Sequence, residues 1–465
     1  MTFLLAACAS SGRPPPMAGA ATPAVEVSVV RDGHSWTADY RFQQPAPVWV
    51  FRRSSLDRDD QRPWRPQSWT VETPGVRLAR LGQYDVLIAD TGVVPDRVRI
   101  RFTPFARDLL ADYDPALVFT DGSVALYDQH FEVFPVASPD EAGHLPIDLT
   151  DHPETESTTR IGFQDRSGPV LHAGRRHERL TLESSGTYVL FGPAEPLVTD
   201  AMATLIDPQL PDWLRSALAA DTPAILAEYA ERLGPAPGGK PTFLISWAGP
   251  TDGVQSMGGS VLPSLVVMRF EGEGVLQENA QVRNSARWFI AHEAAHFWLG
   301  QAVRYQYSRD AWITEGGADL LAVRMVASID PSYDARAALQ ASLDDCIRFA
   351  AGRSIAGAEE RNEHDAYYKC GAMFGLAAEA VARRSGGDFF TFVSGLIQAN
   401  REDAVLTKAE WLAELGRLSG DQALEREIRA MVETGVADPA ATLESLFRLA
   451  GVPHRRDEQR NLRLL

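Results

Sequence analysis

The chain has few cysteines, a deficit of positive charge and no long apolar run. Its 465 residues include only Cys8, Cys346 and Cys370, too few for a fold held together by disulfides. Lysine and arginine total 45 against 62 aspartates and glutamates, so the net charge is −17. Such a chain lacks the basic surface that binds nucleic acids or anionic lipid headgroups. No apolar run reaches the roughly 18 residues that span a bilayer, so we expect neither a nucleic-acid-binding protein nor a polytopic membrane protein.

The first residues resemble an export signal. Leu5-Ala6-Ala7-Cys8 resembles a bacterial lipoprotein cleavage box, in which the cysteine becomes the lipidated N-terminus, and a proline-rich tether follows it. The basic segment that normally precedes such a box is missing, and a frayed apolar N-terminus is the alternative. We expect residues 1–24 to be a truncated lipoprotein-type signal and tether. The protein would then lie in the cell envelope, on the periplasmic side, with Cys8 as its lipid anchor.

The other two cysteines fall in the helical part of the chain. Cys346 lies near the end of one predicted helix (334–351) and Cys370 near the start of the next (364–384). In an antiparallel helix pair they could face each other, and an export compartment would permit a disulfide. Two unpaired, buried thiols are the alternative.

Hydrophobic patterning divides the chain into a β half and a helical half. Between residues 25 and 193, short apolar runs such as Tyr84–Ala89 and Arg97–Phe102 alternate with turn residues, which is typical of a sandwich-like β domain. Residues 194–400 begin with a helix and two buried strands and continue as helices, and 401–465 contain further helices. We expect an α+β multidomain protein whose last residues, 454–465, are frayed.

One short segment carries the residues of a metal site. His292–His296 reads H-E-A-A-H, and because four residues turn a helix through about 400°, both imidazoles project from one face and can chelate one ion. The rest of Trp288–Leu299 is apolar, which predicts a buried helix in which Glu293 needs a compensating cation. The alternative is a pair of core histidines, with Glu293 paired to Arg287 or Arg304.

A third ligand is expected downstream, where Glu315 follows His296 after eighteen residues. Two histidines and one glutamate leave zinc an open position for water, which is the catalytic arrangement. Asp319, four residues later, lies on the same helical face and can accept the second N–H of a ligand histidine, unless it is simply a solvated helix residue. The consecutive glycines Gly316 and Gly317 predict close approach of backbone or substrate.

These residues together resemble the gluzincin metallopeptidases of the aminopeptidase N group. The shared pattern is H-E-x-x-H, eighteen residues, then the glutamate of W-x-x-E-G; the glycyl aminopeptidases are a close second. The resemblance implies a thermolysin-like α/β segment before a helical catalytic domain, behind an N-terminal β domain. It also implies one Zn²⁺ per chain, held by His292, His296 and Glu315, with Glu293 as the catalytic base.

A tyrosine completes the resemblance. In these families the tyrosine of Y-x-K hydrogen-bonds the tetrahedral intermediate, and Tyr367, in the Tyr-Tyr-Lys segment 367–369, matches it. Taken alone, a tyrosine pair near a helix start is more typical of packing. His364, about one turn earlier, either lines the same cleft or simply begins the helix.

One motif of the group has no counterpart. The glutamate of G-x-M-E-N binds the free α-amine of the substrate, but here residues 255–263 read QSMGGSVLP. If Leu265–Arg269 is aligned with the family's strand ahead of the zinc-binding helix, Val261 stands at the glutamate position. If Met257 is aligned with the methionine of the motif, Gly258 stands there. Between Asp252 and Glu271, which are themselves alternative amine anchors, there is no carboxylate. Gly258 and Gly259 could instead offer backbone groups to an extended peptide.

The sequence therefore predicts a zinc-dependent peptidase of the cell envelope that acts on peptides. The missing glutamate leaves open whether it removes N-terminal residues or cuts within chains. The alternative is a non-catalytic envelope lipoprotein that uses the same scaffold to bind peptides or partner proteins.

Overall fold

The computed structural model describes residues 24–465 apart from 151, 153–157, 200–201, 238–239 and 279. Cys8 and the predicted signal and tether lie outside the described residues. The chain packs as two compact units. The described parts of 12–210 and 240–276 form the first, here called the β unit, and those of 211–239 and 277–465 form the second, here called the helical unit.

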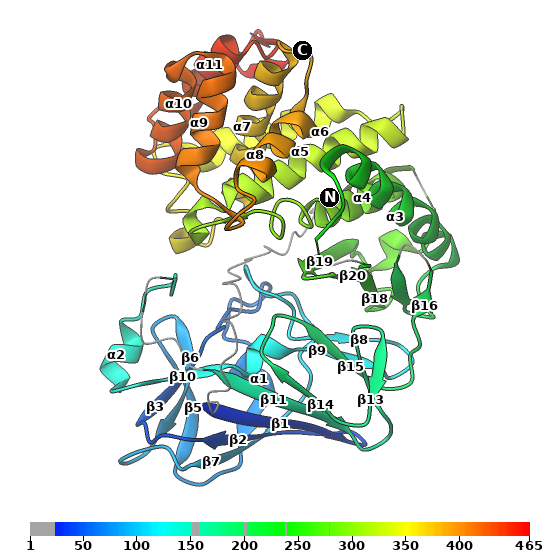
Figure 1. Ribbon diagram of the computed structural model, residues 1–465, viewed down its shortest axis with the longest axis vertical. Coiled ribbons are helices and arrows are strands. Elements are labelled where there is room, and N and C mark those ends of the chain that lie inside the picture. Colours follow the sequence, from blue (N-terminus) through cyan, green and yellow to red (C-terminus); the bar gives the residue numbers. More distant parts are fainter. Residues whose placement is uncertain (1–23, 151, 153–157, 200–201, 238–239, 279) are drawn as a thin grey trace. The chain divides into compact units, whose positions relative to one another are not determined.

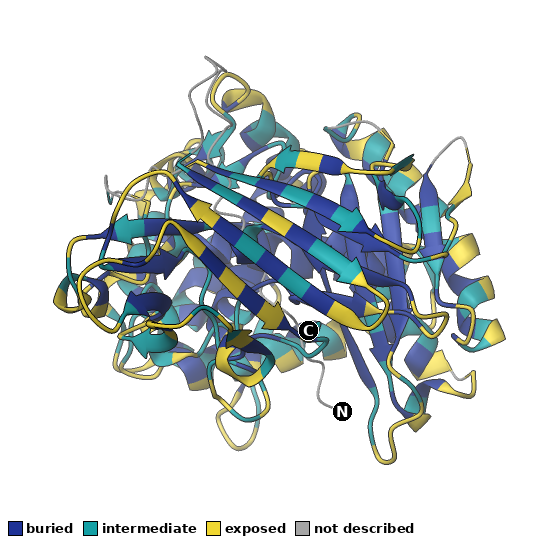
Figure 2. Ribbon diagram, turned by 90° about the horizontal axis from the view of Figure 1, so that it is seen from below, coloured by how far each residue is buried: buried dark blue, intermediate teal, exposed yellow. Residues whose placement is uncertain are grey.

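The β unit consists mainly of sheets (Figure 1). Its largest sheet contains, in spatial order, β14 (Leu180–Glu183), β11 (Thr159–Asp165), β1 (Val25–Asp32), β2 (Ser35–Phe42), β7 (Arg97–Phe102) and β4 (Trp69–Val71). β1 pairs with β11 in parallel and with β2 antiparallel. Buried and exposed residues alternate along β7 and most of β2, as expected for a sheet with one face on a core (Figure 2).

Two further sheets complete the β half that the sequence predicted. One contains β10 (Val133–Val136), β3 (Val48–Phe51), β6 (Tyr84–Ala89) and β5 (Val76–Leu81). The other contains β13 (Arg175–His177), β12 (Val170–His172), β15 (Tyr188–Phe191), β9 (Val124–Tyr127) and β8 (Ala116–Val118). The short helices α1 (Arg65–Ser68) and α2 (Pro139–Gly143) lie in connections between strands. The predicted strands 84–89 and 97–102 coincide with β6 and β7.

A fourth sheet of the β unit contains the two buried strands predicted ahead of the zinc helix. Its order is β16 (Leu197–Val198), β17 (Ala203–Ile206), β18 (Thr242–Trp247), β20 (Leu265–Glu271) and β19 (Ser256–Leu262). The sequence placed these strands with the helices, in 194–400. Packing groups them with the β half because one apolar cluster joins Tyr113 and Tyr188 of that half to Leu244 and Val267 of this sheet.

Helices make up most of the helical unit (Figure 1). They are α3 (Asp212–Leu233), α4 (Ala280–Ala295), α5 (Trp312–Ile329), α6 (Ala335–Ala350), α7 (Asp365–Arg383), α8 (Phe389–Ala399), α9 (Lys408–Ser419), α10 (Gln422–Arg429) and α11 (Pro439–Ala450). The strands β21 (Arg304–Tyr305) and β22 (Val405–Leu406) pair with each other. Helix α5 packs against both α4 and α7, and α6 packs on α7. The Thr407 and Glu410 side chains form a capping box at the start of α9.

Helices α5 and α7 cross at two glycines. A Cβ on Gly316 would lie 2.2 Å from the Cα of Gly371, and a Cβ on Gly371 would lie 2.2 Å from the carbonyl oxygen of Trp312. Only glycine fits at either position. The close approach predicted from the glycine pair at 316–317 is therefore an approach of the α7 backbone.

A disulfide joins Cys346 near the end of α6 to Cys370 in the second turn of α7. Of the two arrangements that the sequence allowed, the structure has the bonded one. The bond closes a loop of chain that includes the whole connection between α6 and α7.

The C-terminal residues are ordered, and the expectation of a frayed end is wrong. His454–Arg456 (β23) and Leu462–Leu464 (β24) form an antiparallel pair. The side chains of Leu462 and Leu464 are buried, and the amide group of Gln340 on α6 hydrogen-bonds the backbone of both. Two buried leucines, the Gln340 hydrogen bonds and the ion pair of Arg463 with Asp344 hold this segment against α6.

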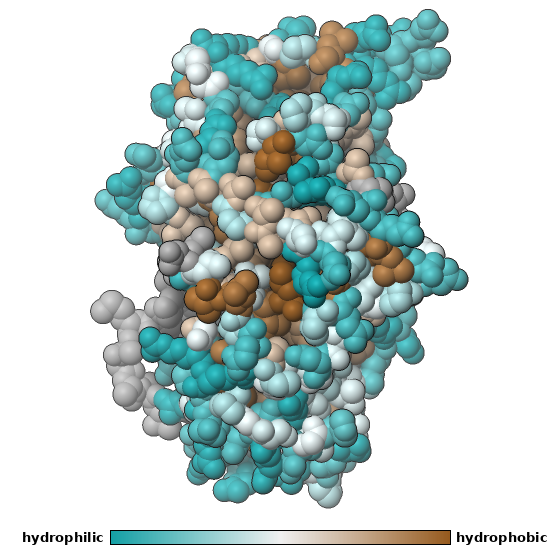
Figure 3. Space-filling model, turned by 90° about the vertical axis from the view of Figure 1, so that its right-hand side faces the viewer, coloured by the Kyte–Doolittle hydropathy of each residue, from teal (hydrophilic) through white to brown (hydrophobic). Residues whose placement is uncertain are grey.

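Polar side chains dominate the face of the molecule that Figure 3 shows. On the face drawn in Figure 3, hydrophilic residues predominate and hydrophobic ones occur in small groups. Within the described part of the chain, none of the helices combines the length and the apolar character that crossing a membrane requires.

Candidate active site

Of the two histidines of the H-E-x-x-H segment, His292 lies in the buried last turn of α4 and His296 directly follows the helix. Residues 289–299 are all buried, as the apolar pattern predicted. Helix α4 ends at Ala295 rather than near residue 300, and His296 follows in a tighter turn in which its N–H bonds to the carbonyl of Glu293 at 3.2 Å. The Nε2 atoms of His292 and His296 are 3.2 Å apart.

The structure brings Glu315 to these two nitrogens. Glu315 lies in the first turn of α5, and its Oε2 is 3.6 Å from Nε2 of His292 and 3.2 Å from Nε2 of His296. All three side chains are buried. The end of α4, the turn that follows it and the first turn of α5 thus bring two nitrogens and one oxygen to one point.

The geometry and charge of this cluster fit a divalent cation. Ligand atoms about 2.0–2.2 Å from a tetrahedral zinc ion lie about 3.4 Å from one another, and the three observed separations are 3.2–3.6 Å. Burial disfavours a charged imidazole, but hydrogen bonds to Asp319 and Glu315 raise the pKa of His292 to about 10. Burial acts against an ionised Glu315, but the neighbouring histidines lower its pKa overall. The cluster therefore stabilises positive charge at its centre.

Three side chains hold the His292 ring in place. Its Nδ1 is 3.0 Å from Oδ1 of Asp319, which is buried and is not the solvated helix residue that was the alternative. The rings of Trp288 and Tyr368 lie against the imidazole, with centroids at 5.4 and 5.7 Å. Nδ1 of His296 instead bonds to the carbonyl oxygen of Leu299 at 2.8 Å. In both rings this leaves Nε2 directed at the common point.

Glu293 lies on α4 between the two histidines and is buried. The alternative explanation of this carboxylate paired it with Arg287 or Arg304. The Arg287 guanidinium binds two other carboxylates, those of Asp221 at 2.8 Å and Asp330 at 3.6 Å. Glu293 directly follows the metal-ligand candidate His292, which is the position expected of a base for a metal-activated water.

The two tyrosines of α7 have different surroundings. The Tyr367 hydroxyl donates to the carbonyl oxygen of Ala356 and accepts from the N–H of Glu359, both at 3.3 Å. Its neighbour Tyr368 is the one whose ring stacks on a metal-ligand candidate, His292. His364 directly precedes α7, with its ring 6.2 Å from that of Tyr367. The Y-x-K pattern pointed to Tyr367 and gave no signal for the contact of Tyr368.

Gly258 and Gly259 lie on β19, at the edge of their sheet in the β unit, whereas the metal-ligand candidates belong to the helical unit. A Cβ on Gly258 would lie 3.5 Å from a carboxylate oxygen of Asp108, a residue far away in the sequence. Arg269, paired with Gly258 across β19 and β20, binds Asp108 at 2.7 Å and also binds Glu271. Glu271, one of the two alternative amine anchors, therefore already has a cationic partner, whereas the other, Asp252, is an exposed turn residue.

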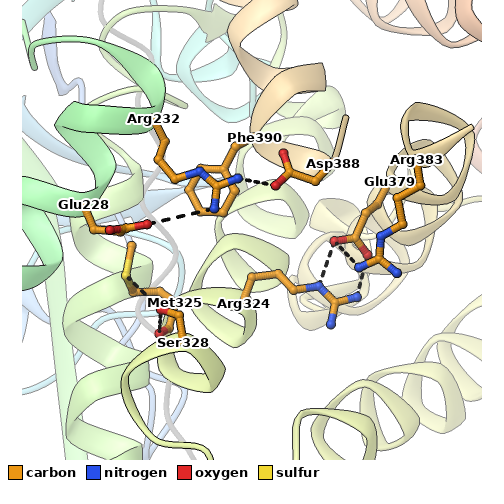
Figure 4. Close-up of a pocket in the computed structure, with 9 residues that line it drawn as sticks. All are labelled: Glu228, Arg232, Arg324, Met325, Ser328, Glu379, Arg383, Asp388 and Phe390. Carbon is orange, nitrogen blue, oxygen red and sulfur yellow. Dashed lines mark hydrogen bonds and ion pairs between the residues drawn. The ribbon is translucent and has the colours of Figure 1, made fainter. Parts of the chain in front are cut away.

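A separate pocket of about 170 Å³ opens between α3, α5, α7 and α8 (Figure 4). It is lined by Glu228, Arg232, Arg324, Met325, Ser328, Glu379, Arg383, Asp388 and Phe390. Its charged groups satisfy one another: Glu379 binds Arg324 and Arg383, and Arg232 binds Asp388 and stacks on Phe390. The metal-ligand candidates are not among its lining residues, and paired charges of this kind are typical of a structural network.

Comparison by sequence finds no family model and no curated protein that matches the chain. Comparison by structure does find similar proteins. An aminopeptidase N family protein from Idiomarina loihiensis superposes with a TM-score of 0.62 at 12% identity, covering 90% of this chain and 78% of the other. An M1 zinc metallopeptidase mutant from Deinococcus radiodurans, bound to a Tyr-Ser-Ala substrate, gives 0.50 at 17% identity, covering 89% and 95%.

Leukotriene A4 hydrolase from Saccharomyces cerevisiae gives a TM-score of 0.51 at 12% identity, covering 90% of this chain and 68% of the hydrolase. At such low identity, similarity of structure establishes the fold and leaves the chemistry to the residues of the site. The chain has the gluzincin fold of the M1 and aminopeptidase N proteins, as its zinc-site motifs predicted.

Proposed function

We propose that this chain is a zinc-dependent peptidase that binds one zinc ion through His292, His296 and Glu315. The observation that carries the proposal is the convergence of these three buried side chains, with donor atoms 3.2–3.6 Å apart. Two histidines and one glutamate form an open ligand set, which is typical of catalytic rather than structural zinc. The fold shared with M1 metallopeptidases supports this function.

Bound zinc would supply Lewis acidity, which polarises a peptide carbonyl and makes a water molecule more acidic. The chain's own contribution begins with Glu293, which takes the proton of the attacking water and passes it to the leaving amine. Burial of this carboxylate beside the ligand histidines keeps bulk water from competing for the proton. Asp319 keeps His292 in the tautomer that directs Nε2 inward.

Tyr367 is the proposed donor to the oxyanion that forms on the substrate. Its hydroxyl bonds to the 356–359 segment, so it must turn away from Ala356 and Glu359 when substrate binds. Catalytic hydrogen bonds often form only in the substrate complex. A Tyr367→Phe variant should therefore lower kcat more than it changes KM, because the bond is made chiefly in the transition state.

We further propose that cleavage does not depend on a free N-terminal amine. The position of the amine-binding glutamate is occupied by Val261 or Gly258, and Asp108 and Glu271 are both ion-paired with Arg269. Matched peptides with free and acetylated N-termini test this point. Similar rates on both are expected, and a strong preference for the free amine would contradict the proposal.

The proposed location is the cell envelope, with export into an oxidising compartment. The Cys346–Cys370 disulfide supports this location because such bonds persist outside the reducing cytosol. Fractionation of the native host, with and without a Cys8→Ser substitution, tests both the compartment and the lipid anchor.

The function as a whole is tested by measuring zinc per chain alongside digestion of a peptide library, with and without a chelator. We expect one zinc per chain and cleavage that stops when the metal is removed. A purified chain that binds no zinc would overturn the proposal. Zinc binding with no cleavage of any peptide would favour the alternative, a scaffold that binds peptides or partners without hydrolysing them.

A further inference from the structure

We infer that Lys369 is a positioning residue for the metal site and acts through Asp319. This inference rests on the proposed zinc site of His292, His296 and Glu315. Lys369 would not touch the metal or the substrate. It would hold the carboxylate of Asp319, which in turn orients the metal-ligand candidate His292.

The geometry is a chain of two contacts across three helices. Nζ of Lys369 on α7 lies 3.1 Å from Oδ2 of Asp319 on α5. The other oxygen of that carboxylate, Oδ1, lies 3.0 Å from Nδ1 of His292 on α4. Each oxygen of Asp319 thus lies close to one cationic or ring nitrogen, Oδ2 to Lys369 and Oδ1 to His292. Asp319 and Lys369 are both largely buried, so water competes weakly for either contact.

The charges around the site give the ammonium group a second effect. Glu293, Glu315 and Asp319 are three buried carboxylates within two packed helices. Burying several like charges together is costly unless cations accompany them. Lys369 offsets one of the three permanently, so Asp319 can remain an ionised acceptor for His292 whether or not metal is bound.

The composition also singles out this residue. Only three of the 45 basic residues are lysines, at positions 240, 369 and 408. Most other ion pairs among the described residues use arginine, whose planar guanidinium is larger than the compact ammonium group of lysine. Lys369 lies two residues before Gly371, where α7 and α5 are in backbone contact, and a compact cation suits such a close helix pair.

The disulfide ties the same stretch of α7 to a second helix. Cys370 follows Lys369 directly and is bonded to Cys346 on α6. Helix α7 is therefore held by α6 at Cys370 and by α5 at Gly371. The Nζ–carboxylate contact is made from a backbone with little freedom to shift.

The test is a zinc-affinity measurement on the full-length chain, using competition with a zinc chelator at fixed pH. Lys369→Met keeps the apolar stem but removes the charge and the donor. Loss of a group that orients a ligand typically costs 10–100-fold in metal affinity, so for a residue one contact further out we expect about 3–10-fold weaker binding. Lys408→Met is the matched control. Lys408 is as exposed as Lys369 and is paired with Glu433 at 2.8 Å, so its loss should leave zinc affinity unchanged.

A double-mutant cycle separates action through Asp319 from a general loss of structure. Asp319→Asn should weaken zinc binding more than Lys369→Met does, and adding Lys369→Met to Asp319→Asn should weaken it no further. Additive losses would overturn the inference, as would unchanged or tighter binding by Lys369→Met. If Lys369→Met fails to fold, Lys369→Gln is measured in its place, with weaker binding again expected. A native chain that binds no zinc would overturn the proposed function and this inference together, whereas native zinc binding with no effect at Lys369 would overturn the inference alone.

Discussion

Gly316 and Gly371 are in backbone contact: a Cβ on the first would lie 2.2 Å from the Cα of the second. This contact brings α5, with Glu315 and Asp319, directly against α7, with its Tyr-Tyr-Lys segment. The ion pair of Lys369 with Asp319 depends on that distance between the helices. The glycines therefore set the geometry of the site without contributing a functional group to it.

Replacing Gly371 by alanine should destabilise the helical unit. The new methyl group would lie 2.2 Å from the carbonyl oxygen of Trp312, so the helices must move apart, at a cost of about 1–3 kcal/mol or more. Gly416→Ala on α9 is the matched control, because no atom lies within 4 Å of the position its Cβ would take. That change should be neutral or stabilising by up to about 1 kcal/mol. Thermal unfolding of both variants measures the difference, and equal melting temperatures would contradict the crossing described here.

Glu293→Gln should remove hydrolysis and leave zinc bound. The amide keeps the size of the side chain but cannot accept the proton of the attacking water, and a general base typically contributes about 10²–10⁴-fold in rate. Zinc per chain and the cleavage rate of one peptide substrate are measured on the same preparation. Retained activity at full zinc occupancy would show that another group is the base.

Removing the disulfide should lower the free energy of unfolding by about 3 kcal/mol, the chain-entropy value for a bond between cysteines 24 residues apart. The Cys346→Ser/Cys370→Ser double variant and the native chain are unfolded in urea with and without reductant. Reductant should destabilise the native chain and leave the variant unchanged. A thiol count on a denatured, unreduced chain carrying Cys8→Ser provides the check. No free thiol is expected, and two would mean that the bond does not form.

The β unit should lose stability in mild acid because of His130. Burial lowers the pKa of this imidazole to about 4, despite the opposing effect of Asp112. The folded-state pKa lies below the unfolded value of 6.5, so the unfolded chain binds the proton more readily. The stability contributed by neutral His130 is therefore fully present above pH 6.5 and is lost progressively as the pH falls toward 4, by up to about 3 kcal/mol.

Urea unfolding followed by tryptophan fluorescence from pH 7.5 to 4.5 measures this loss. His130→Gln should be less stable at neutral pH but less sensitive to acid than the native chain. His34→Gln, at an exposed turn, should reproduce the native pH profile and serves as the control. An unchanged acid dependence in His130→Gln would assign the effect to other groups.

Local pattern was sufficient to predict most elements and the three metal-ligand candidates. The spacing within His292–His296 follows from helix geometry alone, and the apolar residues around it predicted burial correctly. What local pattern could not provide was contact between distant segments. The parallel pairing of β1 with β11 and the carboxylate of Asp108 beside Gly258 both join residues more than 100 positions apart.

The sequence also could not show which of the adjacent tyrosines, Tyr367 or Tyr368, contacts His292. Neighbouring residues on a helix point about 100° apart, so the side chain that meets His292 is decided by how α7 is rotated against α4 and α5. That rotation depends on packing at Gly316 and Gly371, which no periodicity reveals. The contact of Lys369 with Asp319 depends on the same rotation, so the sequence could not predict it either.

The covalent link between α6 and α7 has a practical consequence for anyone handling the protein. A protease that cut the chain anywhere in the connection from 351 to 364 would leave both fragments attached to each other through sulfur. Such a nicked sample would run as a single band on a non-reducing denaturing gel and would separate into two bands only after treatment with a thiol reductant. Preparations should therefore be compared under both conditions before their activities are ranked.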